Sequence, residues 1–279
     1  MSYEKWSELP YAGERTPPRN AEEPSAKSWP MMYLHRDDDG SYVNAAGKKI
    51  TLAIKDPNEI NWDQQLNKVL NAQDHLTEEN KMLAKYWGTG VPTKQITPMM
   101  DILIDTYGVT AARAARMLAV MHAALNDAFV VTWDLKYEWD VARPNQLNQE
   151  LETLLCTPRH PTYPSGHAVI AGCSEAIMSY FFPAERHKIK RLAEDCADSR
   201  LYALVHFPVD NSEGLRLGRQ IGDMVIKHIK KQKDENLRPI DKPYTRSKRA
   251  KILPDLNTQA IPFDFPSTCS SLVREEEEQ

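Results

Sequence analysis

A short loop at residues 160–167 combines two histidines, a serine and a glycine in a pattern suited to anion chemistry. It reads His-Pro-Thr-Tyr-Pro-Ser-Gly-His and runs into an apolar stretch typical of a buried helix. Ser165 is a favourable helix N-cap, and Gly166 lets a ligand approach the backbone. The free N–H groups at a helix start bind anions, and His167 in the first turn could exchange a proton with one. An ordinary serine-capped helix with a surface histidine is the simpler alternative.

Two cations lie close together earlier in the chain. Lys136 and Arg143 are seven residues apart, and Arg143 precedes Pro144. If one helix contains both, their side chains share a face; if the helix ends between them, Arg143 is extended before the proline. Either arrangement lets both donors reach one anion, and the guanidinium fork matches a tetrahedral oxyanion. The alternative is that Lys136 and Arg143 are surface residues that take part in unrelated ion pairs.

A third group lies further along the chain. Arg200 and His206 flank an apolar run, so we predict that both are buried, and Pro208 should end their helix soon after His206. Asp210 could accept a hydrogen bond from one ring nitrogen of His206. The other nitrogen would then be free as a nucleophile or ligand. A buried structural histidine and an N-cap aspartate are the alternative roles.

The elements that must position these residues are mainly helices. Capping residues, glycines and apolar periodicity predict helical structure from Trp62 onward, over residues 77–88, 97–108, 110–137, 165–182, 184–205 and 210–233. The last of these begins with an Asp-x-x-Glu sequence of the capping-box form at Asp210. We therefore predict an all-α domain over residues 60–233.

The flanking segments are irregular. Residues 1–59 begin with five prolines in the first 30 positions, which predicts an extended arm that wraps the domain or is partly disordered. Within this arm, the sequence Asp-Asp-Asp-Gly at 37–40 predicts a β-hairpin, and Gly47 marks a second turn. Residues 234–279 form a polar tail that ends in Glu275–Glu278, and we interpret it as a solvated end without an assigned function.

Size and composition narrow the class of protein. The 279 residues are 41% hydrophobic and permit a proper core, and the net charge of −4 favours neither a nucleic-acid partner nor an anionic membrane. We expect no signal peptide, and no run approaches the ~20 apolar residues of a membrane span. The cysteines are widely spaced without a CxxC pair, which argues against a zinc site or a disulfide framework and favours a cytoplasmic location: Cys156, Cys173, Cys196 and Cys269.

Read together, the three groups spell K-x6-R-P, P-S-G-H and S-R-x5-H-x3-D. This combination resembles the superfamily of type 2 phosphatidic acid phosphatases (PAP2) and vanadium haloperoxidases, over about residues 110–230. The resemblance implies a soluble helical bundle of the PAP2/haloperoxidase type that holds one oxyanion, either vanadate or phosphate.

The resemblance also implies a role for each residue. Donors would surround the oxyanion: Lys136, Arg143, Ser165 through its hydroxyl, Gly166 through its backbone N–H, and Arg200. His206 would bind vanadium or attack phosphorus, and Asp210 would orient His206. His167, on the opposite side, would act as general acid and base. In a haloperoxidase, Lys136 would polarise the peroxide while vanadium acts as a Lewis acid.

Two residues favour the haloperoxidase branch. Trp133 stands three residues before Lys136, which is similar to chloroperoxidases, and His160 stands seven before His167, where bromoperoxidases carry a histidine. We therefore predict a vanadate-dependent enzyme that uses hydrogen peroxide to oxidise halide, and bromide is the expected halide. The alternative is a soluble PAP2-type phosphatase that hydrolyses phosphomonoesters or prenyl or lipid diphosphates through a phosphohistidine at His206.

Other classes fit the sequence less well. A structural or oxyanion-storing bundle would not need two histidines and Asp210, and a metal hydrolase lacks the His-Glu-x-x-His sequence. The cations would also repel a divalent ion. We expect small-molecule partners only, namely halide and hydrogen peroxide or a phosphate ester, without nucleic acid or a membrane span, and a homo-oligomer is compatible with the sequence.

Overall fold

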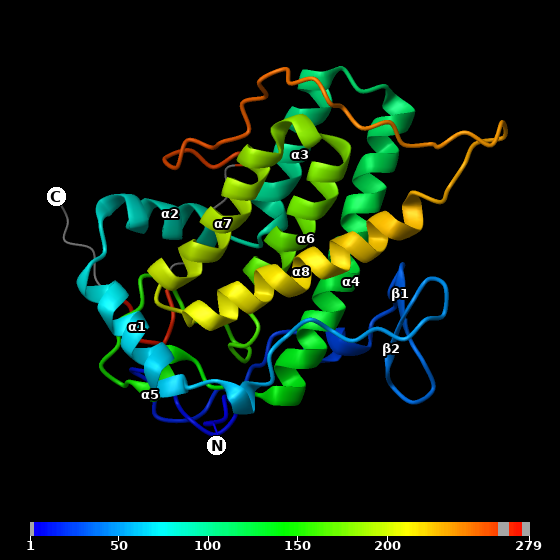
Figure 1. Cartoon of the computed structure of the whole chain (residues 1–279). Helices are drawn as coiled ribbons and strands as arrows, with labels where there is room; N and C mark the ends of the chain where they lie inside the picture. The colour runs from blue at the N-terminus through cyan, green and yellow to red at the C-terminus, as the bar shows by residue number, and fades with distance from the viewer. Residues whose placement is uncertain (1–2, 262–267, 275–279) are drawn as a thin grey trace.

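The computed structural model describes residues 3–261 and 268–274, and its architecture is a bundle of helices (Figure 1). The α-helices are α1 (Trp62–Asp74), α2 (Glu78–Gly88), α3 (Thr93–Tyr107), α4 (Ala111–Trp139), α5 (Pro144–Leu147), α6 (Gly166–Phe181), α7 (Arg186–Tyr202) and α8 (Pro208–Ile229). Three 3-10 helices accompany them: η1 (Pro24–Ser28), η2 (Pro57–Glu59) and η3 (Pro183–Glu185). The strands β1 (Leu34–Arg36) and β2 (Tyr42–Asn44) pair antiparallel. The predicted all-α fold with a short hairpin is confirmed.

Helix α6 lies at the centre of the bundle and contacts α4, α7 and α8. Its apolar side chains are buried around most of its circumference, as expected for a helix surrounded by other helices. Ser165 caps this helix, because its hydroxyl oxygen accepts a hydrogen bond from the backbone N–H of Ala168 at 3.4 Å. The predicted helix start after Ser165 is therefore observed, and it lies inside the bundle.

Helices α6 and α8 run parallel and approach closely along a stripe of glycines on α8. A Cβ atom at Gly218 would lie 2.0 Å from the carbonyl oxygen of Val169, and one at Gly214 would lie 2.9 Å from that of Ser165. The backbone N–H of Ser165 donates to the carbonyl of Asp210 at 3.1 Å, which joins the first turns of both helices. The N-terminal ends of α6 and α8 therefore meet at the same end of the bundle.

Two predicted helix starts need correction. Helix α3 begins at Thr93 instead of residue 97, so Pro98 lies inside the helix. Helix α8 begins at Pro208, which suits the first helical position because that position needs no N–H donor. Asp210 therefore stands in the first turn, and its carboxylate accepts from the backbone N–H of Phe207 at 3.0 Å. The predicted capping box that starts at Asp210 is wrong.

Hydrogen bonds hold the N-terminal arm against the bundle. Its backbone N–H groups at Trp6 and Ala12 donate to the carbonyls of Asp140 and Asn145, at 2.8 and 2.9 Å. Further along the arm, the buried carboxylate of Asp127 in α4 accepts backbone hydrogen bonds from residues 32, 33 and 34. These bonds hold the segment that leads into β1 against α4.

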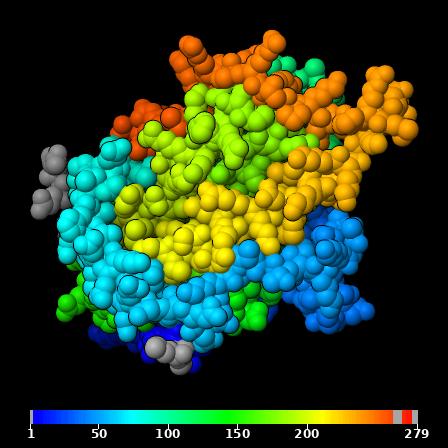
Figure 2. Space-filling view, viewed as in Figure 1, coloured from blue at the N-terminus to red at the C-terminus, as the bar shows by residue number. Residues whose placement is uncertain are grey.

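Part of the tail packs against the bundle, which corrects the prediction of a wholly solvated end, although most of its described side chains are exposed. Residues 240–252 cross the ends of α3, α4, α6 and α7 (Figures 1 and 2). Asp241 pairs with Arg116 of α4 at 2.7 Å, and Ala250 and Ile252 are buried. Residues 268–274 lie beside the loop around residues 153–157, which we call the 150s loop, and Val273 forms an isolated β-bridge with Thr153. The acidic run at 275–278 lies outside the described residues.

A disulfide joins Cys156 to Cys269, with their Cα atoms 5.9 Å apart. This bond corrects the prediction that the cysteines form no disulfide. Wide spacing along the chain concealed it because the tail returns to the 150s loop only in three dimensions. Disulfides are typical of oxidising compartments, so the cysteine argument for a cytoplasmic location no longer holds. The other two cysteines, Cys173 and Cys196, are free and buried.

Helix α4 extends over 29 residues and, in the described part of the chain, is the one helix long and apolar enough to cross a membrane by length and composition. The sequence analysis, which expected no segment long and apolar enough for a membrane span, underestimated the apolar length of the segment that forms α4. Half of its most apolar stretch is buried against the rest of the protein, and the core helix of a soluble protein has the same properties.

Candidate active site

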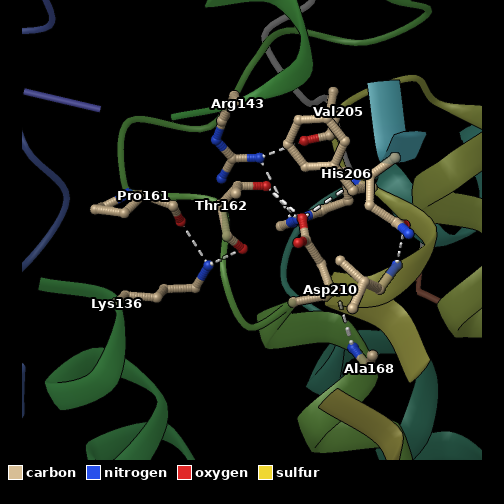
Figure 3. Close-up of polar contacts among 12 residues, drawn as sticks. Lys136, Arg143, Pro161, Thr162, Ala168, Val205, His206 and Asp210 are labelled. Atoms are coloured by element: carbon tan, nitrogen blue, oxygen red, sulfur yellow. Dashed lines mark hydrogen bonds and ion pairs between the residues drawn. The ribbon is translucent and has the colours of Figure 1, made fainter. Parts of the chain in front are cut away.

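His206 lies in the loop between α7 and α8 and is held from one side. Its Nδ1 atom lies 2.8 Å from the carboxylate of Asp210 and 3.0 Å from the hydroxyl of Thr162, and Thr162 in turn donates to the same carboxylate oxygen (Figure 3). All three side chains are almost completely buried. Because an ionised carboxylate only accepts hydrogen bonds, Nδ1 carries the proton and Nε2 keeps its lone pair.

Arg143 and Lys136 approach this histidine from two different elements. Helix α4 ends at Trp139, so Arg143 is extended at the start of α5, which decides between the two arrangements left open by the sequence. The Arg143 guanidinium donates to the carbonyls of His160 and Val205, at 2.9 and 2.7 Å, and its Nη1 lies 3.5 Å from Nε2 of His206.

In the described part of the chain, Lys136 and Arg200 donate to neutral acceptors only. Lys136 donates to the carbonyls of Pro161 and Thr162, at 2.6 and 2.8 Å (Figure 3), and Arg200 donates to the carbonyl of Ala84 at 2.9 Å. Carbonyl oxygens satisfy the hydrogen bonds of these groups but do not neutralise their charge. Within the described residues, the site therefore places three buried basic side chains near one buried carboxylate, that of Asp210. Burial, together with the charge of Arg143, holds the pKa of Lys136 well below 10.5, as expected where no anion is bound.

This excess of charge fits a tetrahedral oxyanion. Burying a charge without compensation is costly, and an oxyanion at the start of α6 would compensate all three cations. The cations also act on the histidines: burial, with nearby positive charge, holds the pKa values of His160, His167 and His206 well below 6.5. All three imidazoles are therefore neutral at pH 7 without a bound anion. Burial also raises the pKa of Asp210, to about 6.

His167 and His160 complete the site. Nε2 of His167 lies 3.1 Å from the carbonyl oxygen of Trp87, which can only accept, so the proton is on Nε2 and the lone pair is on Nδ1. His160 stacks at a tilt against Trp133, with ring centroids 5.0 Å apart, and its Nδ1 lies 3.0 Å from Nη2 of Arg143.

A cavity of about 1500 Å³ opens over this cluster. The predicted residues that line it are Trp133, His160, Gly166, His167, Arg200 and His206. The other predicted residues are fully buried behind that lining: Lys136, Arg143, Ser165 and Asp210. The structure therefore brings all ten predicted residues to one end of the bundle, where α4, α6, α7 and α8 meet.

Three neighbours of the site were not predicted. The Thr162 hydroxyl forms hydrogen bonds with His206 and Asp210. The carbonyl oxygen of Trp87 accepts a hydrogen bond from His167, and the carboxylate of Glu22 lies 4.0 Å from Nε2 of His160. Thr162 lies inside the predicted loop at residues 160–167, so the sequence could have indicated that it lies near the site. Glu22 and Trp87 come from the arm and from α2, and no local pattern links them to residues 160–210.

The family model described as PAP2 superfamily matches residues 114–233, which contain every residue of the three motifs. Residues 114–233 form a PAP2-superfamily domain. The predicted resemblance to this superfamily over about residues 110–230 is confirmed. No curated protein matches the chain.

Solved structures share the fold around this PAP2 domain. A bacterial vanadium-dependent iodoperoxidase aligns at 21% identity with a TM-score of 0.61, over 81% of this chain and 62% of that one. The apo form of a bacterial vanadium-dependent chloroperoxidase aligns at 15% identity with a TM-score of 0.62, over 80% of this chain and 62% of that one. The chain thus spans less than two thirds of the length of either protein.

Proposed function

We propose that this protein is a vanadate-dependent haloperoxidase that oxidises bromide with hydrogen peroxide. One observation carries the proposal: three buried basic side chains with neutral hydrogen-bond partners lie at the same end of the bundle as His206 and His167, and Nε2 of His206 has its lone pair directed away from Asp210. Such a site is preorganised for a tetrahedral oxyanion before that anion arrives. The fold shared with two bacterial vanadium-dependent peroxidases supports this choice.

The residues present would hold vanadate from several sides. Lys136, Arg143 and Arg200 would exchange carbonyl partners for anion oxygens, which are stronger acceptors. The hydroxyl of Ser165 still has its proton to donate, because its oxygen only accepts from Ala168. His206 would bind through Nε2. Vanadate, when bound, supplies a Lewis-acid centre for the oxidation of halide by peroxide.

His167 is suited to move a proton at this site. The carbonyl of Trp87 holds its Nε2–H, which leaves Nδ1 as the basic nitrogen. The nearby Arg200 is one cause of its low pKa, after burial. A bound oxyanion would offset that positive charge and raise the pKa, so His167 could accept a proton from peroxide and return it to product.

Trp133 and His160 define the wall beside the anion site. Their ring contact and the proximity of His160 to Arg143 give a polarisable, donor-rich surface next to the oxyanion position. We propose this surface as the halide environment. Bromide is the proposed halide because of the histidine at position 160.

A phosphatase is the second candidate, and the state of His206 favours it. A neutral imidazole with a fixed tautomer is the nucleophile that a phosphohistidine mechanism requires. The three cations would stabilise the transferring phosphoryl group, and His167 would protonate the leaving alcohol.

A direct assay separates the two functions. The purified protein, with and without orthovanadate, is scored for peroxide-dependent bromination of a small 1,3-diketone and for hydrolysis of an aryl phosphate. We expect bromination only with vanadate, and its loss in His206→Ala. Hydrolysis without vanadate, together with no bromination in its presence, would establish the phosphatase and reject the haloperoxidase.

A further inference from the structure

The cavity above the anion site is far larger than halide and peroxide need. Its volume of about 1500 Å³ exceeds the roughly 300–1,000 Å³ typical of pockets for organic ligands. We call this space the chamber. Its floor carries His167, Arg200 and His206, and its walls include the side chains of Trp29, Phe129 and Leu155. A space of this size and lining is suited to a large organic molecule.

The apolar walls begin directly beside the charged floor. The Trp133 ring lies against Gly166, where a Cβ atom would be 3.4 Å from the ring, and Phe129 packs edge-on against Trp133. On the other side, Leu155 and the Arg200 guanidinium both lie against Gly88. An apolar molecule in the chamber would therefore reach the place where the oxidant forms.

Both chain ends build this chamber, and specific bonds hold them in place. The carbonyl of Glu22 accepts hydrogen bonds from Trp133 Nε1 and the Tyr137 hydroxyl, at 3.1 and 2.6 Å, which fixes the arm to α4. The tail contributes Val273 to the wall and is fixed by the Cys156–Cys269 disulfide. These segments lie outside the residues matched by the PAP2 model, so the chamber is an addition to the anion site.

The charges around the chamber favour a neutral occupant. Arg159 is engaged in a bidentate pair with Glu14, and Arg274 lies 3.8 Å from Glu152, so two cations of the lining are already compensated. The lining also carries Glu22, Glu23 and Lys85, which are charges of both signs, and its buried cation is Arg200 at the floor, where the oxyanion would bind. The aromatic side chains Trp29 and Phe129 suit a flat, unsaturated partner.

We propose that the chamber binds a neutral, apolar, unsaturated organic molecule, such as an electron-rich arene, and that this molecule is the acceptor of the halogen. This inference rests on the haloperoxidase function. Halide, peroxide and one proton give hypohalous acid and water, with two electrons passing from halide to peroxide. The acceptor's C–H bond is then replaced by a C–halogen bond, and its hydrogen leaves with the hypohalous oxygen as a second water.

The first test measures binding without turnover. N-phenyl-1-naphthylamine is neutral and aromatic and fluoresces in apolar surroundings, so a titration gives its Kd for the full chain. We expect saturable binding that weakens roughly tenfold in Trp29→Ala, because one aromatic wall is removed. The matched control is Met32→Ala: Met32 is in the same arm and similarly exposed, at 60% against 48% for Trp29, but does not line the chamber. No binding, or equal binding to Trp29→Ala, would reject the chamber site.

The second test follows the halogen. With vanadate, bromide and peroxide, the bound probe should be brominated even when excess free methionine consumes diffusible hypobromous acid. Trp29→Ala should lose this protection, whereas bromination of a small 1,3-diketone without methionine should be unchanged. If the diketone is brominated but methionine abolishes bromination of the probe, the acceptor role is wrong and the haloperoxidase function stands. If the probe binds but neither compound is brominated, the proposed function fails instead.

Discussion

At the scale of single residues, the site depends on how His206 is held. Asp210 accepts hydrogen bonds from His206, Thr162 and the backbone of Phe207 on one carboxylate oxygen. Burial raises the pKa of Asp210, whereas the hydrogen bonds from Thr162 and Phe207 lower it. The carboxylate must stay ionised to keep the proton on Nδ1 of His206. Thr162 is therefore a positioning residue for the proposed reaction.

Removal of the Thr162 hydroxyl tests this role. In Thr162→Val, Asp210 loses a donor, its pKa rises, and protonation at low pH frees His206. We expect kcat/KM to fall roughly tenfold, since a hydrogen bond to a charged group contributes about 1.5 kcal/mol or more. The acid limb of the pH–rate profile for bromination should move to higher pH.

Thr132→Val is the matched control, because Thr132 is equally buried and its hydroxyl donates within α4 to the carbonyl of Ala128. This variant should keep the pH profile of the natural protein. An unshifted acid limb in Thr162→Val would show that the hydroxyl does not act on Asp210.

At the scale of elements, the parallel pair α6 and α8 sets the geometry of the site. The first turns of both helices are joined by the Ser165–Asp210 backbone bond. Their close contact depends on Gly214, Gly218 and Gly222, which recur every four residues along one face of α8. This spacing places Gly166 of α6 and Asp210 of α8 at the same end, and both helix dipoles are positive there.

Gly218→Ala should therefore destabilise the fold, although alanine is the better helix former by about 1 kcal/mol. The new Cβ would lie 2.0 Å from the carbonyl oxygen of Val169 and 2.8 Å from the N atom of Cys173, so the helices must separate. We expect the free energy of unfolding to fall by about 3 kcal/mol, measured from the denaturant midpoint. Asp223→Ala, on the exposed face of α8, should change it little. Equal midpoints for both variants would mean that the helix contact tolerates a methyl group.

At the scale of the whole molecule, the fold brings three neutral histidines and three cations together in one buried place. An unfolded chain would titrate His160, His167 and His206 near pH 6.5, whereas the folded chain holds their pKa values well below that. As pH falls below 6.5, the unfolded state binds protons that the folded state does not. The three neutral histidines therefore add to the free energy of unfolding above pH 6.5, and this contribution is lost as the pH decreases.

The free energy of unfolding should accordingly decline between pH 6.5 and 5.5, without phosphate or vanadate present. The slope should approach about 4 kcal/mol per pH unit for three histidines, at about 1.4 kcal/mol each, and Asp210 offsets part of it below about pH 6. His160→Gln should reduce the slope by about 1.4 kcal/mol per pH unit, because one buried neutral histidine is removed. A free energy of unfolding that stays constant between pH 5.5 and 7.5 would contradict the conclusion that these buried histidines are neutral.

The sequence alone determined the helices and the chemical residues of the site. Caps such as Ser165, the glycine that ends α3 and the apolar run of α4 act over a few residues, so their signals are local. The motif spacings around Lys136, His167 and His206 likewise indicated one oxyanion site. The start of α3 was misplaced because Pro98 was taken as a first helical residue, and that of α8 because Pro208 was taken only to end the preceding helix.

Only the tertiary structure decided what surrounds that site. The arm carries Glu22 to His160, the tail returns to Cys156, and Gly218 meets Val169 across a helix interface. These contacts join residues that are tens to more than a hundred positions apart, and nothing near either partner encodes them. Long-range packing therefore built the chamber, whereas local patterns along the chain already identified the anion site.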